Sequence, residues 1–146
     1  MKRMLLVAAA AALVTAAAAS AAKPPIFAQP RAVGTIGAPM TVPVKPGAMV
    51  LDTITIQPGG NFGWHTHGSP VAVVVTSGTL TVFDPSVQNC AAFEVSKGQA
   101  FIEPADHVHL ARNDTTQPVT LYAMYLGLPK GSQANSPAKK PATCNT

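Results

Sequence analysis

Residues 59–78 read GGNFGWHTHGSPVAVVVTSG and place the pair His65-x-His67 between a glycine-rich turn and a run of β-branched residues. A second segment, GQAFIEPADHVHLARN at residues 98–113, contains the pair His107-x-His109, so the two segments together hold all four histidines of the chain. On a strand, residues i and i+2 project from the same face about 6.6–7 Å apart. Each pair can therefore direct two imidazoles at one ion.

Short segments with strand character surround both histidine pairs. They are rich in β-branched residues and are separated by turns that contain Gly, Pro, Asn or Asp. Beyond residue 22, no segment of about ten residues has a clean 3.6-residue apolar period, which argues against an architecture with crossover helices. The pattern predicts an all-β sandwich or barrel. The predicted strands are residues 48–56, 62–67, 71–76, 79–83, 92–95, 99–103, 108–112 and 119–126.

Length and composition limit the class of protein. A chain of 146 residues has room for one domain, and only 11% of its residues are charged, while it has 14 prolines and 11 glycines. This balance argues against helical bundles and coiled coils. Beyond residue 22 the basic residues are scattered except for Lys139-Lys140, so the sequence predicts no nucleic-acid partner.

The N-terminal segment has the pattern of an export signal. Two basic residues, Lys2 and Arg3, precede an apolar run at 5–19, and small residues follow at 19–22. The run of about 15 residues is shorter than the roughly 20 that a membrane-spanning helix needs. We therefore expect residues 1–22 to be a cleaved signal peptide, with a periplasmic or secreted mature protein that has no membrane partner. Residues 23–46, which contain six prolines, are expected to form an extended arm.

The two cysteines, Cys90 and Cys144, lie on either side of the last predicted strands. An exported chain meets an oxidising compartment, where an even number of cysteines favours pairing. We expect a Cys90–Cys144 disulfide that fastens the polar tail, residues 129–146, to the domain. The alternative, two free thiols, would leave Cys144 open to oxidation near the terminus.

The two histidine segments resemble the motifs of the cupin family. The first motif is matched by Gly59, His65, His67 and Gly78, and the second by Gly98, Pro104, His109 and Asn113, so eight of ten positions agree over about residues 45–128. Two positions depart from the family pattern. Val71 stands where the family has a glutamate ligand, and Asp106 replaces a glycine of the second motif, an exchange that a turn tolerates.

The resemblance implies a double-stranded β-helix barrel over residues 47–128 that binds one divalent transition metal ion (Fe, Mn, Zn, Ni or Cu). It places His65, His67 and His109 inside as ligands and leaves open what replaces the glutamate. His107 is one candidate for a fourth ligand, and water or substrate is the simpler one. Tyr122 is a candidate barrel-lining residue, with core packing as its alternative. Two acidic residues are expected outside the site, Glu103 at the rim and Asp106 in the turn.

Two functions fit this site, and the sequence identifies no catalytic residue. The first is a dioxygenase-like enzyme for a small anionic or chelating molecule, because three-histidine cupins include thiol dioxygenases and diketone-cleaving enzymes. The second is a non-catalytic cupin that senses, carries or binds a metal ion or small ligand. Since the expected barrel interior lacks a carboxylate base, proton transfer would depend on other groups. A monomer or a homodimer is expected.

Overall fold

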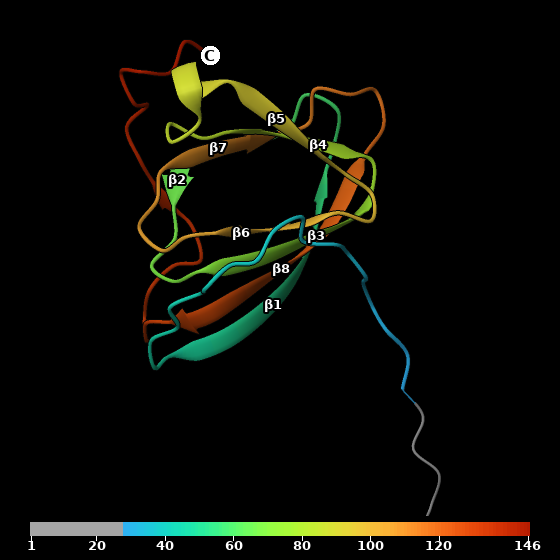
Figure 1. Cartoon of the computed structure of the whole chain (residues 1–146), viewed down its shortest axis with the longest axis vertical. Coiled ribbons are helices and arrows are strands. Elements are labelled where there is room, and N and C mark those ends of the chain that lie inside the picture. Colours follow the sequence, from blue (N-terminus) through green and yellow to red (C-terminus); the bar gives the residue numbers. More distant parts are fainter. Residues whose placement is uncertain (1–27) are drawn as a thin grey trace, which may run out of the picture.

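The computed structural model describes residues 28–146, which form two antiparallel β-sheets. The first sheet has the strand order β1-β8-β3-β6 and the second the order β5-β4-β7-β2-β9. Figure 1 shows the two sheets facing each other, with the first sheet below the second. The strands are β1 (Ala48–Ile56), β2 (Asn61–Thr66), β3 (Val71–Ser77), β4 (Thr79–Phe83), β5 (Ala92–Ser96), β6 (Ala100–Glu103), β7 (His109–Arg112), β8 (Val119–Leu128) and β9 (Ser136–Pro137).

This architecture confirms the predicted all-β fold class. Eight strands lie within two residues of the predicted segments, and only β9, in the polar tail, has no predicted counterpart. Within residues 28–146 the only helix is the short 3-10 turn Gln88–Cys90, and no helix is long and apolar enough to cross a membrane. The predicted signal peptide, residues 1–22, lies outside the described residues.

The core fills the space between the two sheets. Because side chains alternate along each strand, one face of every strand turns inward. In β8 the burial pattern alternates over the first nine residues. Most of the buried positions are β-branched or leucine, as expected for half-buried strands. The buried core consists of Ile56, Val71, Val73, Val75, Leu80, Val82, Val95, Ala111, Val119, Leu121, Ala123, Tyr125 and Leu128.

The pairing of β2 with β7 brings the two histidine segments together. These strands are antiparallel neighbours in one sheet, and His65 is the direct cross-strand partner of His109. Directly paired residues place their Cβ atoms about 4.5–5.5 Å apart on the same face. The two segments thus meet side by side in one sheet rather than across the barrel.

The backbone at Asp106 confirms the expectation that the turn before β7 tolerates Asp in place of the family's glycine. Its φ of 59° lies in the left-handed region, which Asp accepts better than most side chains do. Its backbone N–H donates to the carbonyl of His67 at 2.7 Å. The turn is therefore tied directly to the end of the first histidine pair.

The N-terminal arm, described from residue 28, runs along the edge of the first sheet. It contributes one isolated parallel bridge, between Thr35 and Gln99, with hydrogen bonds from Thr35 N–H to Gly98 and from Ala100 N–H to Thr35. Gly34 permits this approach, because a Cβ there would lie 2.9 Å from the Gln99 carbonyl oxygen.

The C-terminal tail is held against the second sheet. A disulfide joins Cys90 to Cys144, as the sequence predicts, and β9 adds to the free edge of β2. Within this mostly polar tail, Ala134 packs against the hydrophobic core, and Cys144 is 1% exposed. The tail is thus an integral part of the fold.

Asn113 links the turn that follows β7 to the end of β1. Its side chain is fully buried, and its amide donates to the carbonyls of Ile56 and Gln117 at 2.9 and 2.8 Å. Its oxygen accepts from the N–H and hydroxyl of Thr115. Its removal would leave the buried Ile56 carbonyl without this donor and would break the contacts with Thr115 and Gln117.

We predict that Asn113→Ala lowers the free energy of unfolding by about 2–3 kcal/mol, because buried polar groups without partners are costly. The control is Asn61→Ala at an exposed position whose side chain accepts one hydrogen bond from Gly63; we expect a loss of about 0.5 kcal/mol there. Urea unfolding of both variants measures the difference. Equal losses would contradict this role of Asn113.

Candidate metal centre

Three histidines converge in the interior between the sheets. His65 comes from β2, His67 follows the end of β2, and His109 begins β7. They are 4%, 2% and 2% exposed, and one nitrogen from each lies within 4.8 Å of the others. Metal–nitrogen bonds of about 2.0–2.1 Å need ligand nitrogens roughly 3–4 Å apart, so the cluster is close to the geometry of a bound ion.

Backbone carbonyls fix the orientation of all three rings. The Nδ1 of His65 bonds to the carbonyl of Gly63 at 2.9 Å, that of His67 to Ala134 at 2.8 Å, and that of His109 to the carbonyl of His107 at 3.1 Å. Because a carbonyl only accepts, each Nδ1 carries the proton, and in the neutral ring Nε2 holds a free lone pair. This arrangement is typical of histidine ligands.

Two of the Nε2 atoms have no hydrogen-bond partner. Those of His67 and His109 are buried and unsatisfied among the described residues. Buried polar atoms in native proteins nearly always have a partner. A metal ion would satisfy both atoms, so the residues present fit a bound ion.

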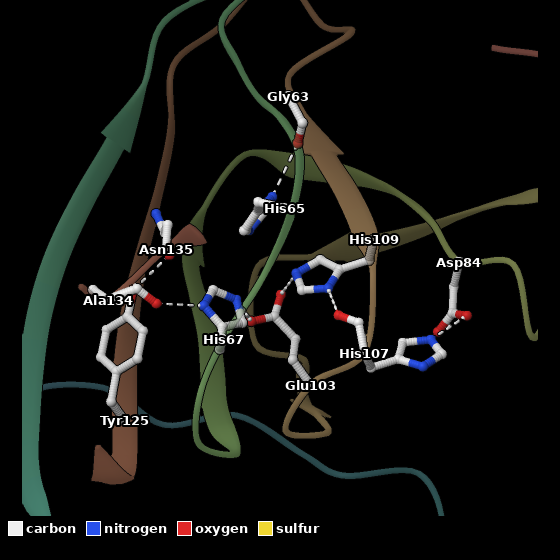
Figure 2. A network of polar contacts seen from close by, with 10 residues as sticks. All are labelled: Gly63, His65, His67, Asp84, Glu103, His107, His109, Tyr125, Ala134 and Asn135. Atoms are coloured by element: carbon white, nitrogen blue, oxygen red, sulfur yellow. Dashed lines mark hydrogen bonds and ion pairs between the residues drawn. The ribbon is translucent and has the colours of Figure 1, made fainter. Parts of the chain in front are cut away.

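Glu103 lies inside the site, which corrects its expected place at the rim. Its carboxylate oxygens are 3.1 Å from Nε2 of His67 and 3.2 Å from Nε2 of His109, and its side chain is 10% exposed. These contacts do not have hydrogen-bond geometry, and they are attractive only when a proton or a metal ion occupies Nε2. Figure 2 shows the carboxylate between the two rings. The three-histidine group thus has a carboxylate beside two of its members.

The sheet register explains how Glu103 reaches this place. Glu103 on β6 is the direct cross-strand partner of Val71 on β3, and Val71 stands where the cupin pattern has its glutamate. Directly paired residues share one face of a sheet. The carboxylate thus comes from the neighbouring strand and enters the same side of the interior. No spacing within the sequence shows this, because it depends on the pairing of β3 with β6.

Burial and mutual contacts set the charges in the site. Burial lowers the pKa of His65 from 6.5 to about 4, so its ring is neutral at pH 7. Burial alone would raise the pKa of Glu103, but contacts with His109 and His67 outweigh it and lower the pKa to about 2. Burial likewise opposes protonation of His109, yet Glu103 raises its pKa. An ionised carboxylate therefore faces basic nitrogens that a proton or a metal ion can occupy.

His107 lies apart from the three-histidine cluster. Its Nε2 contacts Asp84 Oδ1 at 2.7 Å, and Figure 2 shows its ring turned away from Glu103. Its backbone carbonyl nevertheless holds His109. The proposed role of His107 as a fourth ligand does not fit this placement, because the turn before β7 interrupts the strand alternation and directs the ring outward.

Tyr125, rather than Tyr122, faces the pocket. Tyr125 is the cross-strand partner of Val71, whereas Tyr122 pairs with Val74 on the opposite face. The Tyr125 side chain is almost fully buried, its ring centroid lies 5.6 Å from that of His67, and burial raises its pKa to about 12. Residues 122 and 125 of one strand lie on opposite faces, but strand alternation alone does not show which face turns inward.

A small, mainly apolar pocket surrounds the site. Its water-accessible volume is about 30 Å³, enough for roughly two water molecules. None of the lining residues described by the structure is a lysine or arginine. The pocket thus offers hydrogen bonds from a few polar groups within apolar walls. The lining residues are Ile54, Phe62, His65, His67, Val73, Leu80, Glu103, Ala111, Leu121, Ala123, Tyr125 and Asn135.

The facing sheets and their buried histidine cluster define a class of double-stranded β-helix proteins. The sequence matches the Cupin domain family over residues 52–125. This match covers more than half of the chain, and the protein therefore belongs to the cupin family. No curated protein matches the chain at a significant level.

Solved structures share the fold at low sequence identity. The polyketide cyclase RemF from Streptomyces resistomycificus is 16% identical with a TM-score of 0.53, over 66% of this chain and 65% of the cyclase. The DMSP lyase DddQ from Ruegeria pomeroyi DSS-3 is 13% identical with a TM-score of 0.52, over 61% of this chain and 42% of the lyase. This chain thus spans less than two thirds of either enzyme.

The similarity to a third structure extends over almost the whole of that protein. It is an uncharacterized conserved protein with a double-stranded beta-helix domain from Klebsiella pneumoniae subsp. pneumoniae. It is 20% identical with a TM-score of 0.52, over 75% of this chain and 91% of that protein. At such identities the similarity shows a common fold.

We predict that the carboxylate can be moved between the two paired strands. Glu103→Val should weaken binding of Zn(II) by at least about tenfold, because the site loses its only carboxylate. The double variant Val71→Glu with Glu103→Val should recover most of that loss, since the two positions face the same space and the exchange conserves their combined side chains. Zn(II) competition with a chromophoric chelator measures both effects.

The matched control is Glu94→Gln, which removes an exposed carboxylate on β5 and should leave Zn(II) affinity unchanged. No recovery in a folded double variant would show that residues 71 and 103 do not serve the same position.

We predict that neutral His65 contributes stability to the metal-free protein and that this contribution declines as the pH falls from about 6.5 to 5. The folded-state pKa of His65 is about 4, below its ordinary 6.5, so the unfolded chain binds more protons in this window. The contribution of neutral His65 is complete above pH 6.5 and declines on acidification. Urea unfolding in EDTA should give a shallower pH slope for His65→Asn than for the parent. Identical slopes would contradict the burial of a neutral ring.

Proposed function

We propose that this protein binds one divalent transition metal ion through His65, His67 and His109, with Glu103 as the fourth protein ligand. The observation that carries the proposal is the set of three Nδ1–carbonyl hydrogen bonds, which leave the Nε2 lone pairs free to bind an ion. Imidazole and carboxylate donors suit Mn, Fe, Ni, Cu or Zn. One carboxylate and three neutral imidazoles would leave one positive charge on a divalent centre.

We further propose that the protein is an enzyme that uses the bound ion to act on a small chelating molecule. When bound, a divalent ion supplies Lewis acidity and orients its ligands. The Tyr125 hydroxyl stays protonated at neutral pH, with a pKa of about 12. It can donate a hydrogen bond to an oxygen of such a molecule in exchange for its long 3.4 Å contact with Asn135 Oδ1. The apolar walls exclude water from the remaining surface of the molecule.

Glu103 strengthens the enzyme hypothesis relative to the sequence alone. The expectation of an interior without a carboxylate favoured simple binding, whereas a buried, ionised carboxylate lies beside His67 and His109. Such a group can hold the ion or accept a proton. The cyclase and the lyase that share the fold are consistent with an enzyme, although their substrates do not transfer to this chain.

A non-catalytic role in metal binding or sensing is the second candidate. The observation that favours it is the small pocket volume of about 30 Å³, which admits water or a few substrate atoms. In that case the ion itself would be the ligand of interest. A dioxygenase-like reaction remains one form of the first proposal and is tested below.

We also propose that the protein is exported and works in the periplasm or medium. The Cys90–Cys144 disulfide supports this, because disulfides persist in oxidising compartments. The basic and apolar pattern of residues 1–22 is the second line of support.

We predict up to one transition metal ion per chain in protein purified from the periplasm or medium. The double variant His65→Ala with His67→Ala should lose it, because only two protein ligands remain. His107→Ala is the control and should retain most of the metal, since the His107 ring lies outside the cluster. Elemental analysis measures the content, and equal metal in the double variant and the parent would refute the site.

A measurement of turnover distinguishes the proposed enzyme from a non-catalytic metal-binding protein. The parent, loaded in turn with Fe(II), Mn(II), Cu(II), Ni(II) or Zn(II), is offered thiols, diketones and phenolic acids while oxygen consumption and product formation are followed. Metal-dependent turnover that is lost in the double variant would support an enzyme, and oxygen consumption would make it dioxygenase-like. Saturable binding without turnover for any metal would favour the sensor or carrier.

A further inference from the structure

The three carbonyls that orient the histidines come from different parts of the chain. Gly63 and His107 are each two residues from the ring they hold, so β2 and the turn before β7 supply these acceptors locally. The acceptor for His67 is the carbonyl of Ala134, which is 67 residues away in the C-terminal tail. The orientation of one candidate ligand therefore depends on where the tail lies.

Backbone pairing fixes the tail beside the histidines. In β9, Ser136 pairs with Thr66 and Pro137 pairs with His65, and the N–H of Ala138 donates to the Trp64 carbonyl at 2.8 Å. This antiparallel register runs in the direction that brings residue 134 next to His67. The position of the Ala134 carbonyl is thus set by the edge of β2, the strand that carries His65.

The same segment closes one side of the pocket. Asn135 lines it, and the Tyr125 hydroxyl donates to Asn135 Oδ1 at 3.4 Å. Figure 2 shows Ala134 facing His67 and Asn135 close to Tyr125. Two consecutive tail residues therefore contact two different side chains of the site.

The disulfide anchors the end of this segment. Cys144 is bonded to Cys90, which ends the 3-10 turn between β4 and β5. Between β9 and Cys144, the described contacts with the domain are few and the chain is mostly exposed. The two-residue strand β9 offers few hydrogen bonds by itself, so a covalent anchor limits how far the tail can leave β2.

We propose that residues 134–138 are a positioning element of the metal centre, with the Ala134 carbonyl orienting His67, and that the Cys90–Cys144 disulfide keeps this element in place. This inference rests on the proposed metal site. Opening the disulfide lets the tail leave β2, and His67 then loses the acceptor that holds Nε2 toward the ion. Loss of such an acceptor typically weakens metal binding by about 10- to 100-fold.

The test compares two tail variants of the full chain with the parent. Cys90→Ser with Cys144→Ser removes the anchor without a thiol reductant, which would itself bind metal. Ala138→Pro keeps the disulfide but removes the N–H that donates to Trp64; the residue before it remains extended, as a following proline requires. The control, Lys139→Ala, changes an exposed side chain of the same segment.

Two measurements distinguish positioning from a general effect on stability. Zn(II) affinity is determined by competition with a chromophoric chelator, under conditions where circular dichroism shows each variant folded. The visible absorption spectrum of the Co(II)-loaded protein reports the geometry around the ion. We expect both tail variants to bind Zn(II) at least about tenfold more weakly with an altered Co(II) spectrum, and Lys139→Ala to match the parent.

Each outcome bears on a stated part of the inference. Parent-like affinity and spectra in both folded tail variants would overturn the positioning role while the metal site stands. A loss in Ala138→Pro alone would support the role of Ala134 and overturn that of the disulfide. A parent that binds no metal, or a His65→Ala variant that binds it as tightly, would overturn the proposed metal site and the inference with it.

Discussion

The ionised Glu103 carboxylate is buried between the imidazoles of His67 and His109, and this contact constrains how the surrounding strands are arranged. A buried charge is costly unless a positive partner or a metal ion compensates it. The partners must come from separate strands, so the two sheets have to hold β2, β6 and β7 in fixed register. The apolar residues around the cluster then exclude water and strengthen the electrostatic interactions inside.

Val71 replaces the family's glutamate, but a carboxylate is still present beside the proposed site, supplied by a different strand. Val71 and Glu103 are paired residues of β3 and β6, so either position points into the same space. The proposed ligand set therefore depends on which residues face this part of the interior, and a single sequence motif does not define it. It also changes the charge expected at the centre, because three histidines alone would leave a divalent ion uncompensated.

The C-terminal tail contacts the proposed metal site, although its sequence contains no motif that predicts such a contact. Residues after Pro129 are mostly polar, yet Ala134 and Asn135 contact His67 and Tyr125. A backbone carbonyl performs this role, so the side chain at position 134 gives no sign of it. In this proposal the disulfide and β9 together fix the position of the Ala134 carbonyl.

Local alternation and turn residues were enough to predict the all-β fold, and the number of cysteines was enough to predict the Cys90–Cys144 pair. The resemblance to the cupin motifs identified the three candidate histidine ligands. Tertiary structure alone decided the place of Glu103, the choice of Tyr125 over Tyr122, and the contact of Ala134 with His67. Each depends on strand register or on which face turns inward, and both are set by pairing between segments far apart in the chain. Local patterns carry no information on such pairings, since any residue on the correct face of the neighbouring strand can enter the same space.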